Sequence, residues 1–196
     1  MAWEVVYSRK AAKLRERIPG RVKSALDALV LDLAATGPVR GDWPNYSKLS
    51  GELHHCHLKK GHPTYVAVWR AEEYVLWRLF MLGRTKKHRT ETIQLVGSPE
   101  VINRLRKYAV KVGAGVIEPS ERIPAIELSP ELVTNSAGVY LRGIRNREDL
   151  TQDALAQITG ISRSNISAME HGRRPIGKET AKRLAAALNC DYRRFL

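Results

Sequence analysis

The amino-acid sequence predicts an α+β domain followed by an all-α domain. The first 90 positions begin with a short run of β-branched and aromatic residues that is typical of a strand. Hydrophobic residues then repeat at helical spacing, and strand-like runs return after Tyr46. From Val139 onward the pattern is helical throughout. Glycine and proline punctuate the stretch between these two parts. We therefore expect a domain at 1–90, a connector at 91–137 and a second domain at 138–196.

The first domain is expected to have the element order β-α-α-β-β-β. Ser8 is a favourable N-cap for the first helix, which Pro19 and Gly20 end. Two helices after a strand are enough to cover one face of the sheet that the later strands complete. The expected elements are a strand at Trp3–Tyr7, helices at Ser8–Ile18 and Arg21–Thr36, and strands at Leu53–Lys59, Thr64–Ala71 and Tyr74–Leu82.

The connector contains one amphipathic helix. Ser98, Pro99 and Glu100 form a favoured helix start, and apolar residues then recur at helical spacing as far as Val112. Ile117–Thr134 has no clear period and is expected to be an extended or irregular linker.

Four helices are expected in the second domain, at Val139–Glu148, Thr151–Thr159, Ser162–His171 and Gly177–Leu188. Thr151 and Ser162 are natural N-caps, and Gly160 and Gly172 stand where helices end. The second and third of these helices are expected to pack against each other through apolar side chains. These are Ala154, Leu155, Ile158, Ile161, Ile166 and Met169.

The charge balance points to a polyanionic partner. The chain has a formal net charge of +13, with 33 Lys and Arg against 20 Asp and Glu, and nucleic acid is the first candidate for such a protein. Asp27 and Asp32 interrupt the longest apolar stretch, so no membrane span is expected. The first residues lack the pattern of an export signal, and Cys56 and Cys190 lie far apart. We expect a cytoplasmic protein with reduced thiols.

The run from Leu150 to Pro175 closely resembles the Xre/Cro-repressor family of helix-turn-helix domains, over about residues 139–190. The outer face of its second helix carries residue types that bind base edges and phosphates. The resemblance implies that Gln152 and Arg173 or Arg174 bind the DNA backbone, that Arg145 and Glu170 form a structural ion pair, and that a homodimer binds operator DNA. The expected DNA-binding residues are Gln152, Ser162, Arg163, Ser164, Asn165, Ser167 and Arg173. The alternative is that Gln152 only caps its helix and Arg163 is a solvated surface charge.

The segment from Tyr46 to Trp69, after a strand and a helical hairpin, resembles the RelE/ParE toxin superfamily, particularly its RelE- and HigB-like members. The likeness covers about residues 1–90. It implies either an endonuclease that cuts messenger RNA on the ribosome, as in the RelE branch, or a gyrase poison, as in the ParE branch.

Strand alternation places His55, His57 and Lys59 on one face of the sheet. Metal-free RNA cleavage needs a base, an acid and cations, so His55 or His57 is the expected base, Lys59 and Arg84 the phosphate ligands and His88 the acid. The expected RNA-binding residues are Lys60, Tyr65, Lys86, Lys87 and Arg89. No cofactor is expected.

Two alternatives compete with catalysis. His54, His55, Cys56, His57 and His62 include metal-ligand types, but they lack a recognised zinc spacing, so no metal is expected. The other alternative is a basic docking surface. It is favoured by Leu82–Thr90, which lacks the tyrosine with which family members commonly finish.

Together the two resemblances indicate a fused toxin–antitoxin protein of the HigB/HigA type. The stripe Val101, Leu105, Tyr108 and Val112 is the expected toxin-neutralising surface, although it could instead pack within the second domain or at a homodimer interface. We expect an autoregulatory DNA-binding repressor whose toxin-like domain is inhibited in cis or vestigial. The alternatives are an active metal-independent messenger-RNA endonuclease and a sensor domain that controls a transcription factor, for which the sequence shows no motif.

Overall fold

The computed structural model describes residues 3–49, 53–60, 65–71, 76–82, 99–111 and 122–196. The chain divides into two compact units, one formed by residues 1–84 together with 122–196, the other by residues 85–121. This division differs from the expected one, because the strand-containing and the helical parts share one unit. In the second unit the structure describes α3 (Pro99–Lys111), which is the helix expected in the connector.

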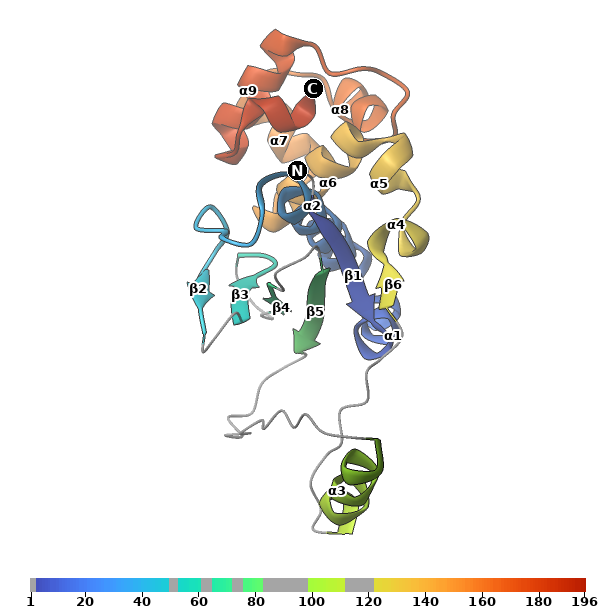
Figure 1. Cartoon of the computed structure of the whole chain (residues 1–196). Coiled ribbons are helices and arrows are strands. Elements are labelled where there is room, and N and C mark those ends of the chain that lie inside the picture. The colour runs from blue at the N-terminus through green and yellow to red at the C-terminus, as the bar shows by residue number, and fades with distance from the viewer. Residues whose placement is uncertain (1–2, 50–52, 61–64, 72–75, 83–98, 112–121) are drawn as a thin grey trace. The chain divides into compact units, whose positions relative to one another are not determined.

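The larger unit contains a six-stranded sheet with the strand order β2-β3-β4-β5-β1-β6 (Figure 1). The first strand pairs in parallel with β5 and antiparallel with β6, and the remaining pairs are antiparallel. The strands are β1 (Glu4–Ser8), β2 (Ser47–Lys48), β3 (Leu53–His57), β4 (Val66–Arg70), β5 (Leu76–Leu82) and β6 (Arg122–Pro124). The expected β-α-α-β-β-β order is therefore present, and β2 and β6 extend it.

Two helices follow β1, as predicted. The Ser8 hydroxyl caps α1 (Arg9–Arg17) by accepting a hydrogen bond from the backbone N–H of Ala11 at 3.2 Å. The second helix, α2 (Gly20–Thr36), ends at Gly37, whose φ of +86° favours glycine. α1 contacts β1, β5 and β6, whereas α2 contacts both β1 and the later helix α6 (Ser136–Arg147). Since α2 lies between the sheet and α6, its buried residues are not confined to one face.

The linker expected at Ile117–Thr134 is wrong for residues 122–134. β6 pairs with β1 at the edge of the sheet, and the short helices α4 (Ala125–Leu128) and α5 (Glu131–Thr134) follow it directly. Ala125 and Leu132 are buried in the core. Residues 117–121 lie outside the described part of the chain.

The C-terminal helices agree with the expected positions. α6 is followed by α7 (Gln152–Thr159), α8 (Arg163–Glu170), α9 (Lys178–Leu188) and a final 3₁₀ turn, Tyr192–Phe195. The hydroxyls of Thr151 and Ser162 cap α7 and α8, and Gly160 and Gly172 have positive φ where helices end. These predictions are confirmed.

Two acidic side chains on α2 are buried and hold several elements together. Arg15 of α1 donates to both carboxylate oxygens of Asp27, at 2.7 and 3.0 Å. Asp32 accepts hydrogen bonds from Trp43 Nε1 at 2.8 Å, Arg194 Nε at 3.0 Å and the Tyr140 hydroxyl at 3.4 Å. Burial raises the pKa of both carboxyl groups, against the effect of their hydrogen-bond donors. Asp32 thereby joins the sheet-containing part of the unit to its helical part.

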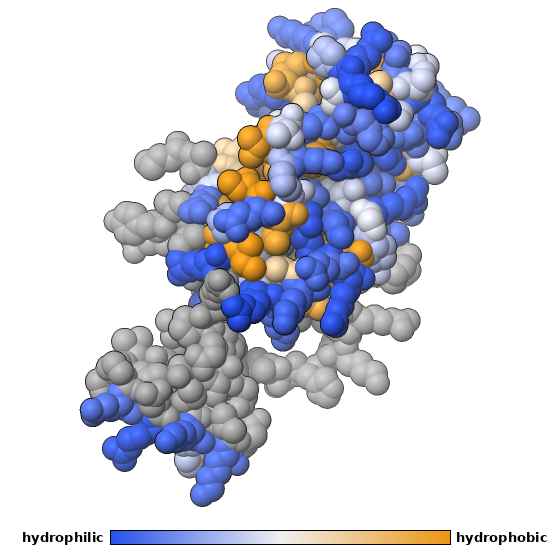
Figure 2. Space-filling view, turned by 90° about the vertical axis from the view of Figure 1, so that its right-hand side faces the viewer, coloured by the Kyte–Doolittle hydropathy of each residue, from blue (hydrophilic) through white to orange (hydrophobic). Residues whose placement is uncertain are grey.

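The face of the larger unit that Figure 2 shows is mostly hydrophilic. Figure 2 shows charged and polar side chains around a smaller apolar area.

Cys56 and Cys190 are free thiols, as predicted, and Cys56 is completely buried. No helix among the described residues has the length and apolar composition needed to cross a membrane.

The crossing of α2 and α6 depends on small side chains. A Cβ atom added at Gly143 of α6 would lie 2.4 Å from the Cβ of Ala28 and 2.4 Å from the backbone oxygen of Ser24. Neither atom can move without moving α2 itself. Only glycine therefore allows the two helices to approach this closely.

We expect Gly143→Ala to lower the free energy of unfolding by about 1–3 kcal/mol, because overpacking at the crossing outweighs the better helix propensity of alanine. Urea unfolding measures the change. Gly20→Ala is the matched control, since a Cβ there meets nothing within 4 Å. Equal stability of the two variants would contradict this account of the crossing.

Candidate nucleic-acid interface

Helix α8 is held by a small apolar core against α7. Leu155, Ile161, Ile166 and Met169 are all buried, as predicted, and Gly160 makes the turn between the helices with a φ of +64°. The prediction for Ile158 is wrong, because its side chain is 58% exposed. The remaining apolar contacts fix the orientation of α8 and leave its N-terminal end at the surface.

A buried ion pair braces α8 against α6. Arg145 donates to the two carboxylate oxygens of Glu170 at 2.6 and 3.0 Å, and both side chains are almost completely buried. The same guanidinium also donates to the Leu150 carbonyl at 2.7 Å, so its charge is well compensated. The structural ion pair implied by the family resemblance is therefore confirmed.

Gln152 is oriented by this ion pair. Its Nε2 donates to Oε2 of Glu170 at 2.8 Å, while the helix cap itself is Thr151. The alternative that Gln152 only caps α7 is thus not what the structure shows. A side-chain amide has two N–H donors, so Gln152 can still donate to a phosphate while it stays bound to Glu170.

Of the other expected DNA-binding residues, Ser162, Arg163, Ser164 and Asn165 lie at the N-terminal end of α8, Ser167 lies further along the helix, and Arg173 lies in the loop after it. Ser162, Arg163, Ser164 and Arg173 are exposed, and Asn165 and Ser167 are half-buried. Arg163 lies 3.5 Å from Asp153, and both side chains are about two-thirds exposed or more. Arg174 donates to Oδ1 of Asn165 at 3.3 Å. An exposed arginine beside short polar side chains is suited to hydrogen-bonding base edges.

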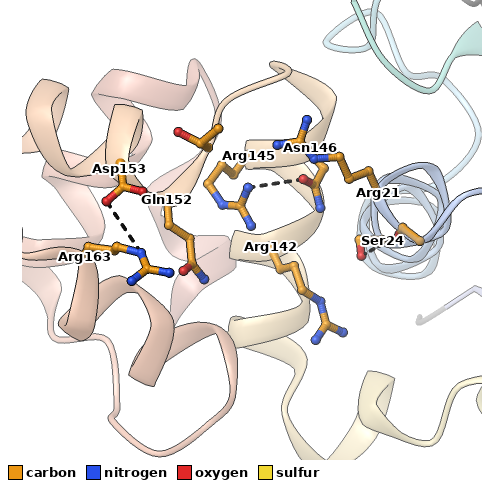
Figure 3. Close-up of a pocket in the computed structure, with 10 residues that line it drawn as sticks. Arg21, Ser24, Arg142, Arg145, Asn146, Gln152, Asp153 and Arg163 are labelled. Atoms are coloured by element: carbon orange, nitrogen blue, oxygen red, sulfur yellow. Dashed lines mark hydrogen bonds and ion pairs between the residues drawn. The ribbon is translucent and has the colours of Figure 1, made fainter.

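An open hollow of about 390 Å³ adjoins this helix end. In Figure 3 Arg163 and Gln152 extend from one side of the hollow, Arg142 from α6, and Ser24 and Arg21 from α2 on the other side. The lining residues are Gly20, Arg21, Ser24, Arg142, Arg145, Asn146, Thr151, Gln152, Asp153 and Arg163. Arg21 and Arg142 were not among the expected site residues, because nothing in the sequence indicated that α2 packs against α6.

The histidine-containing strand alternates as predicted. His54, Cys56 and Leu58 are buried, whereas His55, His57 and Lys59 are half-buried on the opposite face. The rings of His55 and His57 have centroids 6.5 Å apart. Partial burial and the charge of His55 lower the pKa of His57 below its ordinary value. His57 is therefore neutral at neutral pH, the protonation state that a general base requires.

The segment before β3, which includes β2, supplies a partner to each histidine. Asn45 Nδ2 donates to Nδ1 of His57, and the Ser47 hydroxyl is bonded to Nδ1 of His55, both at 3.0 Å. The buried His54 is bonded to the Tyr46 hydroxyl at 2.8 Å. These contacts fix the rings, so the histidines also have a structural role.

Lys59, an expected phosphate ligand, and Lys60, an expected RNA-binding residue, face carboxylates of the turn after α6. Lys59 Nζ lies 3.6 Å from Asp149, and Lys60 Nζ lies 2.5 Å from Glu148. The backbone N–H of Lys60 also donates to the Arg147 carbonyl at 3.0 Å. Tyr65 is half-buried and packs against the core. The remaining expected residues of this site, Arg84, Lys86, Lys87, His88 and Arg89, lie outside the described residues.

No group of three or more metal-ligating side chains that could hold an ion occurs among the described residues. His62 lies outside them. In α3, Leu105 and Tyr108 are exposed, whereas the side chain of Val101 and all of Val112 lie outside what the structure describes. The neutralising role of this stripe stays a prediction.

We expect Glu170→Gln to lower the free energy of unfolding by about 3 kcal/mol, because Arg145 would keep a buried charge without its carboxylate. Chemical denaturation of the variant measures this change. Glu179→Gln, which removes one partner of an exposed surface ion pair with Lys182, serves as the control and should leave the midpoint unchanged. A wild-type midpoint for Glu170→Gln would refute the bracing role of the ion pair.

Comparison with known proteins agrees with this geometry. Residues 141–195 match the model of a helix-turn-helix family. Over 58 residues the chain is 41% identical to RghR of Bacillus subtilis, described as a helix-turn-helix type transcriptional repressor. This match covers 29% of the present chain and 43% of the relative, so the chain spans less than half of that protein. No solved structure matches the chain significantly. The C-terminal part of the chain is thus a helix-turn-helix domain.

Proposed function

We propose that this protein is a sequence-specific DNA-binding transcriptional repressor that reads operator DNA with α8. The observation that carries the proposal is the braced α7–α8 pair, which presents Arg163 and Ser164 at the exposed end of a rigid helix. Its similarity to a helix-turn-helix repressor supports the same function. Such a helix suits a homodimer that binds a palindromic operator. In an autorepressor this operator lies in the promoter of the protein's own gene.

The test is a binding experiment with DNA that the wild-type chain selects from a random library. Arg163→Ala should reduce the preference for the selected site over a scrambled site by about 1–3 kcal/mol, because a base-edge contact is lost. Arg163→Lys is the matched control for charge. It keeps the cation and loses the bidentate fork, so it should retain binding to scrambled DNA while losing site preference. Unchanged preference in both variants would refute the role of Arg163.

We further propose that residues 1–90 are a toxin-like module that is silent in the intact chain. The support is the environment of Lys59 and Lys60, whose ammonium groups face Asp149 and Glu148 of the helical part. A carboxylate beside a phosphate-binding cation competes with the phosphate for it. In this account the helical part neutralises the toxin-like face through the 148–149 turn, and the α3 stripe is a second candidate for the same role.

An active messenger-RNA endonuclease is the alternative function of this module. The neutral His57 beside His55 favours it, because the two rings share a half-exposed face with Lys59. Messenger RNA and the ribosome would be its partners. No step of the expected chemistry requires a metal or a cofactor.

We expect the wild-type chain to leave messenger RNA intact in a translating extract, and the double variant Glu148→Gln, Asp149→Asn to cut it. The full chain must be used, because residues 1–84 share one compact unit with 122–196. Adding His57→Ala to the double variant should abolish cleavage. Cleavage by the wild type would instead favour the active endonuclease, and an inert but folded double variant would show that the module is vestigial.

A further inference from the structure

We propose that the hollow beside α8 receives backbone phosphates of DNA flanking the operator half-site, and that Arg21 and Arg142 bind them. The strand-containing part of the chain would then contribute directly to DNA binding through α2. This inference rests on the proposed repressor function and extends its interface beyond the helix-turn-helix domain.

Continuity with the proposed reading surface is the first argument. Gln152 and Arg163, both expected to contact DNA, line the same hollow as Arg21 and Arg142 (Figure 3). DNA that lies along the end of α8 continues past the start of α7, where its phosphates come within reach of a basic surface. The hollow is therefore placed for the DNA backbone rather than for a separate ligand.

The charge of the lining is the second argument. It contains four arginines and one carboxylate, Asp153. Arg145 is fully engaged by Glu170, but Arg21 is only 3.6 Å from Asp149, and both of those side chains are about half exposed. A solvent-exposed ion pair at this distance contributes little to stability. A phosphate can therefore replace the Asp149 carboxylate beside Arg21 at a low cost in free energy.

Arg142 supplies the third argument. One of its terminal nitrogens donates to Glu131 at 2.6 Å. Its Nε is buried and has no hydrogen-bond partner among the described residues. The Arg142 side chain as a whole is still 25% exposed, so terminal N–H donors that Glu131 does not occupy can bond a phosphate oxygen.

The fourth argument is rigidity. α2 packs closely against α6 at Gly143. Ser24, which is one turn from Arg21, takes part in that crossing. Arg21 is consequently carried by a helix whose position relative to α6 is fixed before DNA arrives. Its backbone needs no ordering on binding, which favours the contact.

The experiment measures the affinity of Arg21→Ala for selected and scrambled DNA over a range of salt concentrations. Because phosphates carry no sequence information, both affinities should fall about three- to tenfold while the preference for the selected site is unchanged. The slope of log affinity against log salt should become shallower by about one. Arg17→Ala, at an exposed arginine of α1 outside the hollow, is the matched control and should leave affinity and slope as in the wild type.

A second variant tests the same contact in the opposite direction. Asp149→Asn removes the carboxylate that competes for Arg21, and asparagine tolerates the φ of +58° at this position. It should strengthen binding to both DNAs. The gain should be smaller when Arg21→Ala is also present, and this difference separates the effect of Arg21 from that of Lys59, which also faces Asp149.

The outcomes separate this inference from the proposed function. If Arg21→Ala behaves like Arg17→Ala while Arg163→Ala still loses site preference, the flanking contact is refuted and the repressor stands. If the wild-type chain selects no DNA sequence, both proposals fail. Unfolding curves of the variants show whether any loss of binding comes from loss of the fold.

Discussion

The close crossing of α2 and α6 is the contact on which the rest of the larger unit depends. Because Gly143 has no side chain, the two helices approach so closely that a Cβ atom at this position would clash with the Cβ of Ala28 and the backbone of Ser24. At that separation α2 packs on β1 of the sheet and, through α6, on the helical part of the chain. The buried Asp32 adds a polar link, since its donors Trp43, Tyr140 and Arg194 come from both parts of the chain. Removing the helical part would expose the side of α2 that packs on α6 and leave Asp32 with only Trp43 of these three donors.

This shared core limits how the proposed toxin-like module could be released. Separate antitoxins can release a toxin by being degraded, whereas here the helical part completes the core around α2. Release of a folded toxin-like module by cutting the chain is therefore disfavoured. A local change at the 148–149 turn is the smaller step, because it would free Lys59 and Lys60 without disturbing the crossing. The proposed silencing depends on two surface ion pairs, and the proposed DNA reading depends on the buried pair of Arg145 with Glu170.

Local signals in the sequence predicted most of the helices and strands. They did not predict which elements pack against each other across long distances in the sequence. The caps Ser8, Thr151 and Ser162 were predictable because each acts within three residues of its own position. β6 was missed because three residues that include a proline show no period, and its partner β1 lies more than a hundred positions earlier. Asp27 and Asp32 were read only as interruptions of an apolar stretch, although they are buried and bonded to distant residues. Arg21 could not be assigned to the interface for the same reason.

The two kinds of proposed DNA contact would contribute differently to recognition. Arg163 and its neighbours face base edges and would set sequence preference, whereas Arg21 and Arg142 would add affinity on any sequence. Adding non-specific affinity strengthens binding to the operator and to competing DNA equally, so the second pair cannot improve discrimination. It can, however, make occupancy respond more steeply to ionic strength. Because α2 carries Arg21 and also packs on the sheet, a change in the strand-containing part that tilts α2 would alter the proposed operator affinity without touching α8. The crossing at Gly143 is then the physical route by which the two parts of the chain could influence each other.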